Sequence, residues 1–437
     1  MQSLWEQTAK LPVFPKLKHD IRTDVLVVGG GLAGLLCAEQ LGQNGLDVIV
    51  AEGNTVFGGV SARTTAKVTT QHGAIYHTLE KNSGLSAAKQ YYTAQREAMD
   101  EYRRLADRFS FDYEECDAYL YSSDNRLALR AERSTISRIG GKAEWTTDLP
   151  VEIPVAGALK IPHQAQLNPL RLAEGLLPNL TVYEHTRVRE LRGQTAVTDD
   201  GILILAKAII VATHFPFLNR HGAYFLKLYQ HRSYVIALEN TAMSHAMLWS
   251  DKQDGITIRR YGEYVLLAGG GHRTGQKGAG FQPVEEFAHR YFPEAKIACR
   301  FATQDCMSLD GVSYIGQYAP STPSLYVATG FNGWGMTSAM VAALVLSGEI
   351  TGNPKPFAAV FNPQRSIWHK QLAVNATESI KGLLTPTVPR CPHLGCALKW
   401  NPWEHSWDCG CHGSRFDENG ILLNGPATGD FPKRKAD

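Results

Sequence analysis

Six cysteine and histidine residues lie within a short stretch close to the carboxyl end of the sequence. The first group reads Cys391-Pro-His393-Leu-Gly-Cys396, and the second, twelve residues later, reads Cys409-Gly-Cys411-His412. Thiolates hold iron–sulfur clusters, and in one cluster type two imidazoles replace two thiolates on one iron. Zinc also accepts these ligands, but a four-ligand zinc site leaves two of the six positions unexplained, and zinc ligand pairs are usually spaced by two to four residues. The pattern favours an iron–sulfur cluster, with a structural zinc site as the alternative.

A glycine-rich turn near the amino end forms a second chemical pattern. Residues 24–28 read as a buried strand, residues 29–34 carry the spacing Gly-x-Gly-x-x-Gly, and residues 35–44 read as a helix. In this context the glycines allow a tight turn and a close approach of the backbone to a pyrophosphate at the helix amino terminus. Residues 47–51 read as a second strand, and Glu52 follows it where it can accept hydrogen bonds from an adenosine ribose. The pattern predicts a dinucleotide-binding domain.

The C-terminal cysteine and histidine pattern resembles the two cluster-binding boxes of Rieske [2Fe–2S] proteins. The resemblance also implies a disulfide between Cys396 and Cys411 that joins the two loops over the cluster. The disulfide would be an exception in a reducing compartment, so it would need protection by burial. The resemblance implies two ligands on each iron, which are Cys391 with Cys409, and His393 with His412.

Three further residues in these boxes bear on the expected behaviour of the cluster. In the resembling family, Ser414 is placed to donate a hydrogen bond to a cluster sulfide, which raises the reduction potential. Many high-potential members carry tyrosine where this chain has Phe416, and phenylalanine has no hydroxyl to donate. We therefore expect a potential below the top of the range of about −150 to +300 mV that Rieske centres span. Gly410 replaces the proline usual in the second box, which leaves that loop freer.

The segment 58–67, Gly-Gly-Val-Ser-Ala-Arg-Thr-Thr-Ala-Lys, directly follows the second strand. It resembles the second glycine pair and polar loop of D-amino-acid oxidases and glycine oxidases, which favours FAD over NAD. The glycine-rich turn 330–337 precedes an apolar helix, 338–347, whose amino terminus is expected to face the flavin. The whole chain resembles bacterial FAD-dependent oxidoreductases of the D-amino-acid oxidase superfamily with a C-terminal Rieske domain. The residues expected to bind FAD are Gly29, Gly31, Gly34, Glu52, Arg63, Thr64, Thr65, Val188, Gly330, Gly335, Met336 and Thr337.

This resemblance implies three parts. They are an α/β FAD-binding part with a Rossmann-like parallel sheet, an α+β substrate part with an antiparallel sheet, and a small all-β Rieske segment. The expected boundaries are 1–80, 155–216 and 304–356 for the FAD-binding domain, 81–154 and 217–303 for the substrate domain, 357–384 for a linker, and 385–437 for a truncated Rieske segment.

Local patterns support the expected substrate domain. Residues 85–106 have helical spacing with Ser86 as the expected N-cap. Short strands at 233–238, 255–260 and 264–268 are separated by turn signals and predict an antiparallel sheet. In the resembling family such a sheet covers the flavin and lines the substrate cavity. No catalytic acid or base can be assigned, and the polar candidates, each also common as a structural residue, are Tyr234, Tyr261, His272 and Arg273.

Composition limits the partners and the compartment. The formal net charge is only +2 over 437 residues, which argues against nucleic acid as a partner. No apolar run is long enough for a transmembrane segment, and residues 1–22 lack the apolar core of a signal peptide. These features favour a cytoplasmic protein. The four cysteines outside the motif are expected to be buried apolar residues: Cys37, Cys116, Cys299 and Cys306.

The expected function is the oxidation of a small amine or amino acid by hydride transfer to FAD. Electrons would then pass one at a time through the Rieske cluster to an external carrier, a ferredoxin-like protein or a quinone. One alternative runs in reverse, with the cluster feeding FAD and FAD reducing an unsaturated or imine substrate. Another alternative is a redox sensor or electron-transfer protein with no substrate of its own. A cavity over the flavin would favour an enzyme.

Overall fold

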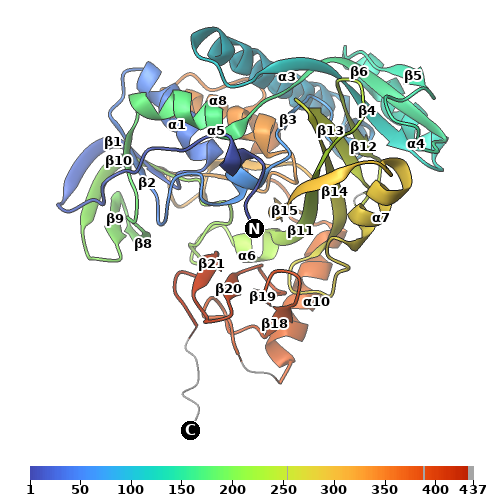
Figure 1. Cartoon of the computed structure of the whole chain (residues 1–437). Coiled ribbons are helices and arrows are strands. Elements are labelled where there is room, and N and C mark those ends of the chain that lie inside the picture. Colours follow the sequence, from blue (N-terminus) through green and yellow to red (C-terminus); the bar gives the residue numbers. More distant parts are fainter. Residues whose placement is uncertain (253, 387–388, 432–437) are drawn as a thin grey trace.

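The chain forms two large β-sheets and one small one (Figure 1). The structure, a computed structural model, describes residues 1–252, 254–386 and 389–431. The first sheet has eight strands in the order β16-β17-β10-β1-β2-β7, with β9 paired beside β10 and β8 beside β9. Strands β17, β10, β1, β2 and β7 run parallel, which confirms the predicted Rossmann-like sheet. The bounds are β1 (Ile21–Val28), β2 (Val48–Ala51), β7 (Thr181–Tyr183), β8 (Val188–Arg192), β9 (Thr195–Thr198), β10 (Leu203–Val211), β16 (Tyr314–Gln317) and β17 (Leu325–Thr329).

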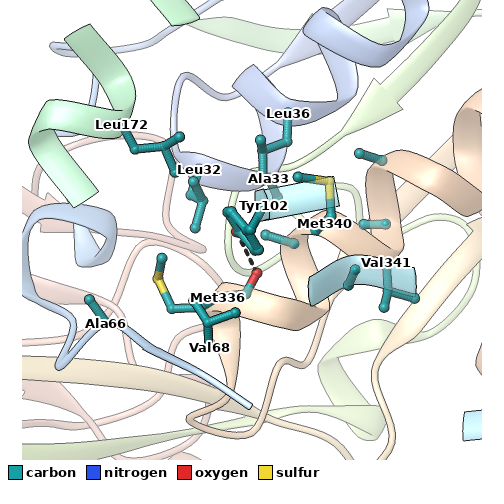
Figure 2. Close-up of a cluster of buried hydrophobic side chains, with 14 of the residues drawn as sticks. Leu32, Ala33, Leu36, Ala66, Val68, Tyr102, Leu172, Met336, Met340 and Val341 are labelled. Atoms are coloured by element: carbon teal, nitrogen blue, oxygen red, sulfur yellow. Dashed lines mark hydrogen bonds between the residues drawn. The ribbon is translucent and has the colours of Figure 1, made fainter. Parts of the chain in front are cut away.

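Two helices, α1 (Leu32–Gln43) and α8 (Gly335–Ile350), form the centre of the largest core beside this sheet. Every residue of α8 from Met336 to Gly348 is buried, as expected of a helix that is apolar on all sides. The hydroxyl of Tyr102 donates to the Met336 carbonyl at 2.8 Å and ties α3 (Leu85–Arg108) to the start of α8. Figure 2 shows this cluster of side chains, which includes Leu32, Ala33, Leu36, Leu172, Met340 and Val341.

The second sheet has nine strands in the order β15-β11-β14-β13-β12-β4-β6-β3, with β5 beside β6. Its ladders are antiparallel except for β12 with β4, so the predicted antiparallel sheet is confirmed. The bounds are β3 (Lys67–Val68), β4 (Glu114–Ser122), β5 (Glu144–Thr146), β6 (Gly157–Gln166), β11 (Tyr229–Glu239), β12 (Ala246–Ser250), β13 (Thr257–Tyr261), β14 (Tyr264–Arg273) and β15 (Lys296–Met307). The remaining helices before residue 335 are α2 (Ile75–Ser83), α4 (Arg126–Arg138), α5 (Pro169–Leu176), α6 (Tyr224–Lys227) and α7 (Gln282–Tyr291), with short turns η1 (Trp5–Gln7), η2 (Val60–Arg63) and η3 (Leu177–Asn179).

Sheet membership differs from the domain boundaries that the sequence predicts. Strands β3 and β6 and the last residues of β15 fall within the ranges assigned to FAD binding, yet all pair in the nine-stranded sheet. Pairing between strands that are distant in the sequence decides which sheet a strand joins, and the sequence of a short strand does not indicate its partner. The predicted N-cap of α3 is wrong. The helix begins at Leu85 after Gly84, which has φ +87° and no side-chain cap, and Ser86 lies inside the first turn.

The C-terminal segment, residues 389–431, forms a small four-stranded antiparallel sheet against the rest of the chain (Figure 1). The predicted linker is mostly helical and contains α9 (Ala358–Phe361) and α10 (Lys370–Leu384). Among the described residues, no helix combines the length and the hydropathy that a bilayer span requires. The strands are β18 (Leu398–Asn401), β19 (Ser406–Cys409), β20 (Arg415–Asp417) and β21 (Leu422–Asn424).

Candidate functional site

A cavity of about 510 Å³ is lined by residues of both large sheets. On the side of the parallel sheet, its wall includes the turn after β1, the end of β2 with Glu52, and Val188 of β8. On the other side, the wall is made of strands β11, β12, β13, β14 and β15. The C-terminal segment closes part of the same cavity with residues 423–428. Three parts of the chain therefore meet at one cavity.

The glycine turn after β1 has the shape that a dinucleotide requires. Gly29 has φ +114°, and a Cβ placed there would lie 2.5 Å from the Ala212 carbonyl oxygen. A Cβ on Gly34 would lie 1.9 Å from the Gly29 carbonyl oxygen, so only glycine lets α1 begin this close to the strand. The cradle is thus built from backbone, as close approach to a pyrophosphate demands.

Glu52 organises this turn from the end of β2. Its carboxylate accepts hydrogen bonds from the N–H groups of Gly30 and Asn54, both at 2.7 Å. Burial raises the pKa of Glu52, and these two hydrogen bonds work against that rise. A carboxylate has about four acceptor positions, so Glu52 retains capacity for the hydroxyls of a ribose. The residues around it fit the adenosine half of FAD.

The remaining predicted FAD residues divide into two groups. Arg63 donates to the Gly58 carbonyl at 3.2 Å, and the Thr337 hydroxyl lies 2.9 Å from His72 Nε2, so both side chains contact protein rather than the cavity. Gly34 and Gly330 are likewise absent from its wall. The predicted residues that line the cavity are Gly29, Gly31, Glu52, Thr64, Thr65, Val188, Gly335 and Met336.

The neighbouring strands β11 and β15 present alternate residues to the cavity. His231 pairs with Asp305, and Ser233 pairs with Thr303, across the ladder. These four residues, with Val235 further along β11, line the cavity, because residues two apart on a strand share a face. The sequence interpretation did not select them. Residues 301–307 read Phe-Ala-Thr-Gln-Asp-Cys-Met, without alternation of polar and apolar residues, so the sequence does not indicate which side of β15 faces the cavity.

None of the four catalytic candidates is among the residues that line this cavity. Tyr234 follows Ser233 and therefore points to the opposite face of β11, where its hydroxyl lies 3.0 Å from His272 Nε2. Tyr261 is held by Asn168, whose amide donates to it at 3.0 Å, and by Asp112. Arg273 donates to the carbonyls of the second cluster box, which are those of Gly410 and Cys411, both at 3.2 Å.

The C-terminal segment brings the four predicted cluster ligands together. Cys391, Cys409 and His412 are buried, and His393 is half-buried. The two imidazole rings are 4.9 Å apart between centroids and perpendicular, at 89°. His393 Nδ1 and both ring nitrogens of His412 are buried without a hydrogen-bond partner among the described residues. Unpartnered buried nitrogens are costly unless they bind something, and a metal cluster satisfies them.

The thiols are equally suited to bind a metal. The Cys391 thiol and the backbone N–H groups of residues 411–413 form hydrogen bonds to Cys409 and lower its pKa to about 7. A thiol with a lowered pKa supplies the thiolate that iron binds. The hydrogen bond with Cys409 and burial raise the pKa of Cys391. Ser414, which accepts a hydrogen bond from the Ala427 N–H at 3.0 Å, opposes that rise through its hydrogen bond to the Cys391 thiol. Phe416 is fully buried and offers no hydroxyl to the site.

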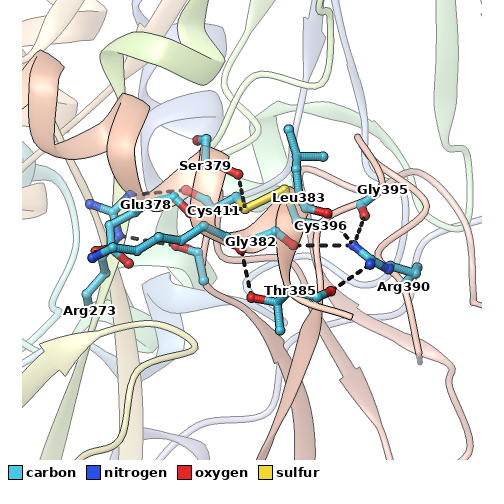
Figure 3. The surroundings of a disulfide bond; sticks show 12 residues. Arg273, Glu378, Ser379, Gly382, Leu383, Thr385, Arg390, Gly395, Cys396 and Cys411 are labelled. Atoms are coloured by element: carbon cyan, nitrogen blue, oxygen red, sulfur yellow. Dashed lines mark hydrogen bonds and ion pairs between the residues drawn. A yellow bond between two sulfur atoms is a disulfide. The ribbon is translucent and has the colours of Figure 1, made fainter. Parts of the chain in front are cut away.

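Cys396 and Cys411 form a disulfide, with their Cα atoms 6.5 Å apart. Figure 3 shows it among residues 378–383 of α10, with Arg390 donating to the carbonyls of Gly395 at 3.0 Å and Thr385 at 2.6 Å. Gly382 of α10 packs directly against the bond, since a Cβ there would lie 2.4 Å from Cys411 Sγ. Both cysteines are buried, as protection of the bond requires. The disulfide leaves two thiols and two imidazoles of the motif free for a cluster.

The C-terminal segment is docked through the face of β11 and β15 that points away from the cavity. Gln230 donates to the carbonyls of His412 at 3.0 Å and Gly425 at 3.1 Å. Gln304, on β15, donates to the Gly413 carbonyl at 2.9 Å. One strand pair therefore has the cofactor cavity on its odd-numbered face and the cluster-binding loops on its even-numbered face.

The loop after β10 contacts the two histidines directly. The Phe215 ring, which also lines the cavity, lies edge-on to His412 at 6.2 Å between centroids, and Phe225 lies at 6.3 Å. Asn219 Oδ1 is 2.9 Å from His393 Nε2. Because His393 Nδ1 has no hydrogen-bond partner within the described part of the chain, this contact orients the ring so that Nδ1 is free for a metal.

A buried ion network fixes the same interface. Arg232 of β11 pairs with Glu404 at 3.0 Å, and Glu404 also pairs with Arg415 at 3.0 Å. Arg415 bonds Asp408 at 2.9 Å, and all four side chains are at least 92% buried. Burial alone would raise the pKa of Glu404, but the two arginines outweigh it and lower that pKa.

Glu404→Gln is expected to lower the free energy of unfolding by about 3–5 kcal/mol, because it leaves a buried arginine without its counter-charge. Urea unfolding followed by fluorescence measures the change. The matched control is Glu190→Gln, which removes one carboxylate from an exposed pair with Arg192 and should leave the unfolding midpoint unchanged. Equal midpoints for both variants would contradict a stabilising role for the network.

Comparison with known proteins follows the same division of the chain. The model of the FAD dependent oxidoreductase family (DAO) matches residues 24–348, and the Rieske [2Fe-2S] domain model matches residues 355–434. The Rieske 2Fe-2S iron-sulfur protein YhfW of Bacillus subtilis (strain 168) is 32% identical over 98% of this chain and 96% of its own length. Gamma-glutamylputrescine oxidoreductase of Escherichia coli (strain K12) is 29% identical over 46% of this chain and 51% of its own length.

The fold also has close structural relatives. Glycine oxidase from Geobacillus kaustophilus superposes with a TM-score of 0.67 at 19% identity, over 80% of this chain and 100% of that one. The Rieske match to the C-terminal segment sets aside the zinc alternative, and the cofactors are FAD and a [2Fe–2S] cluster. The chain therefore belongs to the DAO family of FAD-dependent oxidoreductases, and it carries a Rieske domain at its C-terminal end.

Proposed function

We propose that the protein oxidises a small amine or amino acid and delivers the electrons one at a time, through its Rieske cluster, to an external acceptor. The acceptor would be a ferredoxin-like protein or a quinone. The observation that carries the proposal is the strand pair β11 and β15, which has the cofactor cavity on one face and the cluster-binding loops on the other. Two redox sites separated by one layer of sheet are suited to exchange electrons within a single chain.

The chain's own residues supply binding, orientation and exclusion of water. When bound, FAD supplies a two-electron acceptor and the cluster a one-electron carrier. The glycine cradle and Glu52 would hold the adenosine half of FAD, and the backbone at the start of α8, at Gly335 and Met336, would face its flavin half. The four ligands Cys391, Cys409, His393 and His412 would hold the cluster.

The walls of the cavity favour an enzyme that binds its own substrate over a protein that only transfers electrons. The aromatic rings of buried Trp249 and half-buried Trp334 pack edge to face, 5.2 Å apart, and both line the cavity together with polar residues of β15. Apolar walls with a few polar groups are typical of small-molecule sites. The similarity to gamma-glutamylputrescine oxidoreductase over 46% of this chain supports an amine as the substrate.

The test is an anaerobic titration of the purified protein with a panel of amines and amino acids. Bleaching of the flavin absorbance and the EPR signal of the reduced cluster are followed together. Reduction of both by one compound supports the proposed direction of electron flow. Electron flow in the reverse direction, from the cluster to FAD, predicts that no amine or amino acid bleaches the flavin. A chemical reductant of the cluster would then lead to reduction of the flavin. Bleaching without a cluster signal would contradict the internal transfer.

Asn219→Leu is expected to raise the reduction potential of the cluster and leave its EPR intensity unchanged. The asparagine oxygen accepts from His393 Nε2, and such an acceptor makes a ligand imidazole a stronger electron donor. Redox titration followed by EPR measures the potential, which for the unaltered protein should lie below the top of the Rieske range because Phe416 has no hydroxyl. Asn179→Leu, at an exposed site, is the control. An unchanged or lower potential in Asn219→Leu would contradict the assigned contact.

A further inference from the structure

The charged residues in the cavity wall formed by the second sheet are two carboxylates, Asp251 and Asp305, and two lysines, Lys67 and Lys252. Lys252 lines the cavity, but its ammonium group pairs with Asp124 at 2.7 Å. His231 lies 3.2 Å from Asp254. Lys67 Nζ donates to the hydroxyls of two threonines at 2.8 and 3.2 Å. Asp305 is the carboxylate that β15 contributes to this wall, and it has no hydrogen-bond or ion-pair partner within 4.0 Å among the described residues.

Asp305 is fixed in position by the strand that carries it. It lies between Thr303 and Met307 on the cavity face of β15. Its carboxyl carbon would be 3.8 Å from a Cβ placed on Gly333, so it faces the loop before α8. Trp334 follows Gly333 in that loop and packs against Trp249. A carboxylate beside electron-rich aromatic rings is a suitable environment for an organic cation.

The same cavity offers little to a substrate carboxylate. The arginine among its lining residues is Arg187, which lies beside the adenosine end and donates to Asn54 at 2.8 Å. Arg259 is buried behind the wall, where it donates to Gln166 at 2.6 Å and to the Leu167 carbonyl at 3.0 Å. A bound carboxylate would meet Asp305 without a free guanidinium to compensate.

We propose that Asp305 anchors a cationic amine that carries no carboxylate of its own, and that it accepts the proton from the amine's nitrogen. This inference rests on the proposed function and narrows its substrate class from amines and amino acids to amines. The proton moves from the substrate ammonium to a carboxylate oxygen of Asp305. The N–H bond breaks, an O–H bond forms, and the nitrogen keeps the electron pair as a neutral amine.

The electrostatics of the wall agree with this role. Burial raises the pKa of Asp305 to about 6, against the opposing influence of Arg232 and Lys67. The carboxyl group is therefore mainly ionised at neutral pH and still able to hold a proton. Burial lowers the pKa of Lys67 to about 7, so this lysine supplies only part of a positive charge. A cation gains more at this wall than an anion does.

The test compares a cationic and an anionic probe of equal size on the FAD-loaded protein without oxygen. Propylammonium chloride and sodium propionate are titrated separately, and the shift of the flavin absorbance band gives each dissociation constant. Propylammonium should bind more tightly than propionate. Asp305→Asn should weaken propylammonium binding by about 30-fold or more, and it should tighten propionate binding because it removes a like charge from the wall. Asp200→Asn, which removes an exposed carboxylate outside the cavity, should change neither constant.

Asp305→Glu keeps the negative charge and should keep the preference for propylammonium over propionate. This variant provides a second test if Asp305→Asn does not bind FAD. Propylammonium binding within threefold of the unaltered protein in Asp305→Asn would overturn the proposal. Tighter binding of propionate than of propylammonium by the unaltered protein would overturn it as well. The two proposals can fail separately. If amines still bleach the flavin of Asp305→Asn, only the role of Asp305 is contradicted. If the protein binds propylammonium but no amine bleaches its flavin, only the proposed oxidation is contradicted.

Discussion

His412→Ala is expected to abolish the iron–sulfur cluster while FAD stays bound. His412 is buried with both ring nitrogens unpartnered, and alanine provides no ligand in their place. The flavin cradle lies on the other face of β11 and β15 and contains no atom of His412. The iron content should fall to near zero, the EPR signal of the dithionite-reduced protein should vanish, and the flavin-to-protein ratio should be unchanged.

The matched control is His405→Asn, which replaces an exposed histidine of the same segment. Asparagine also tolerates the positive φ of +50° at this position. This variant should retain iron and the EPR signal in full. A His412→Ala protein that keeps its EPR signal would contradict the ligand assignment. Stoichiometric zinc in the unaltered protein would contradict the cluster itself.

Gly34→Ala is expected to give a protein without FAD and with an unfolding free energy lowered by about 3 kcal/mol. The added Cβ would lie 1.9 Å from the Gly29 carbonyl oxygen, and backbone on both sides must shift to admit it. Overpacking of a close contact typically costs about 1–3 kcal/mol, and a clash between two backbone segments belongs at the upper end. The flavin-to-protein ratio and the midpoint of urea unfolding measure the two effects.

Gly42→Ala tests the same substitution in the same helix where space is open, since nothing lies within 4 Å of the added Cβ. It should keep FAD and be slightly stabilised, because alanine is the better helix former. If Gly34→Ala retained FAD as fully as Gly42→Ala, the tight turn after β1 would not be what shapes the cofactor site.

The motifs that depend on local chemistry could be predicted from the sequence. The strand, glycine turn and helix at residues 21–43 are encoded by neighbouring residues, and the structure has them in place. The two boxes around Cys391 and Cys409 were equally readable, because the spacing of their ligands is local. The disulfide between Cys396 and Cys411, which only the resemblance implied, is formed.

The features that depend on pairing between distant strands could not be predicted. Tyr234 and Ser233 are neighbours in sequence, yet one faces His272 and the other the cofactor cavity. Strand β11 is largely buried on both faces, so the order of polar and apolar residues along it does not reveal which face lines the cavity. Asp305 was not predicted as a cavity residue for the same reason. Arg273 was expected to lie near the substrate, but it donates hydrogen bonds to the loop of the second cluster box. No local sequence pattern indicates that the C-terminal segment packs against β11.

The central claim is that two redox centres on opposite faces of β11 and β15 exchange electrons within one chain. Its most direct test is anaerobic light-driven reduction of the bound flavin with EDTA, followed by the rate at which the cluster's EPR signal appears. The account predicts that this rate is unchanged over a tenfold range of protein concentration. A cluster that stays oxidised beside a bleached flavin, or a rate that rises in proportion to protein concentration, would contradict it.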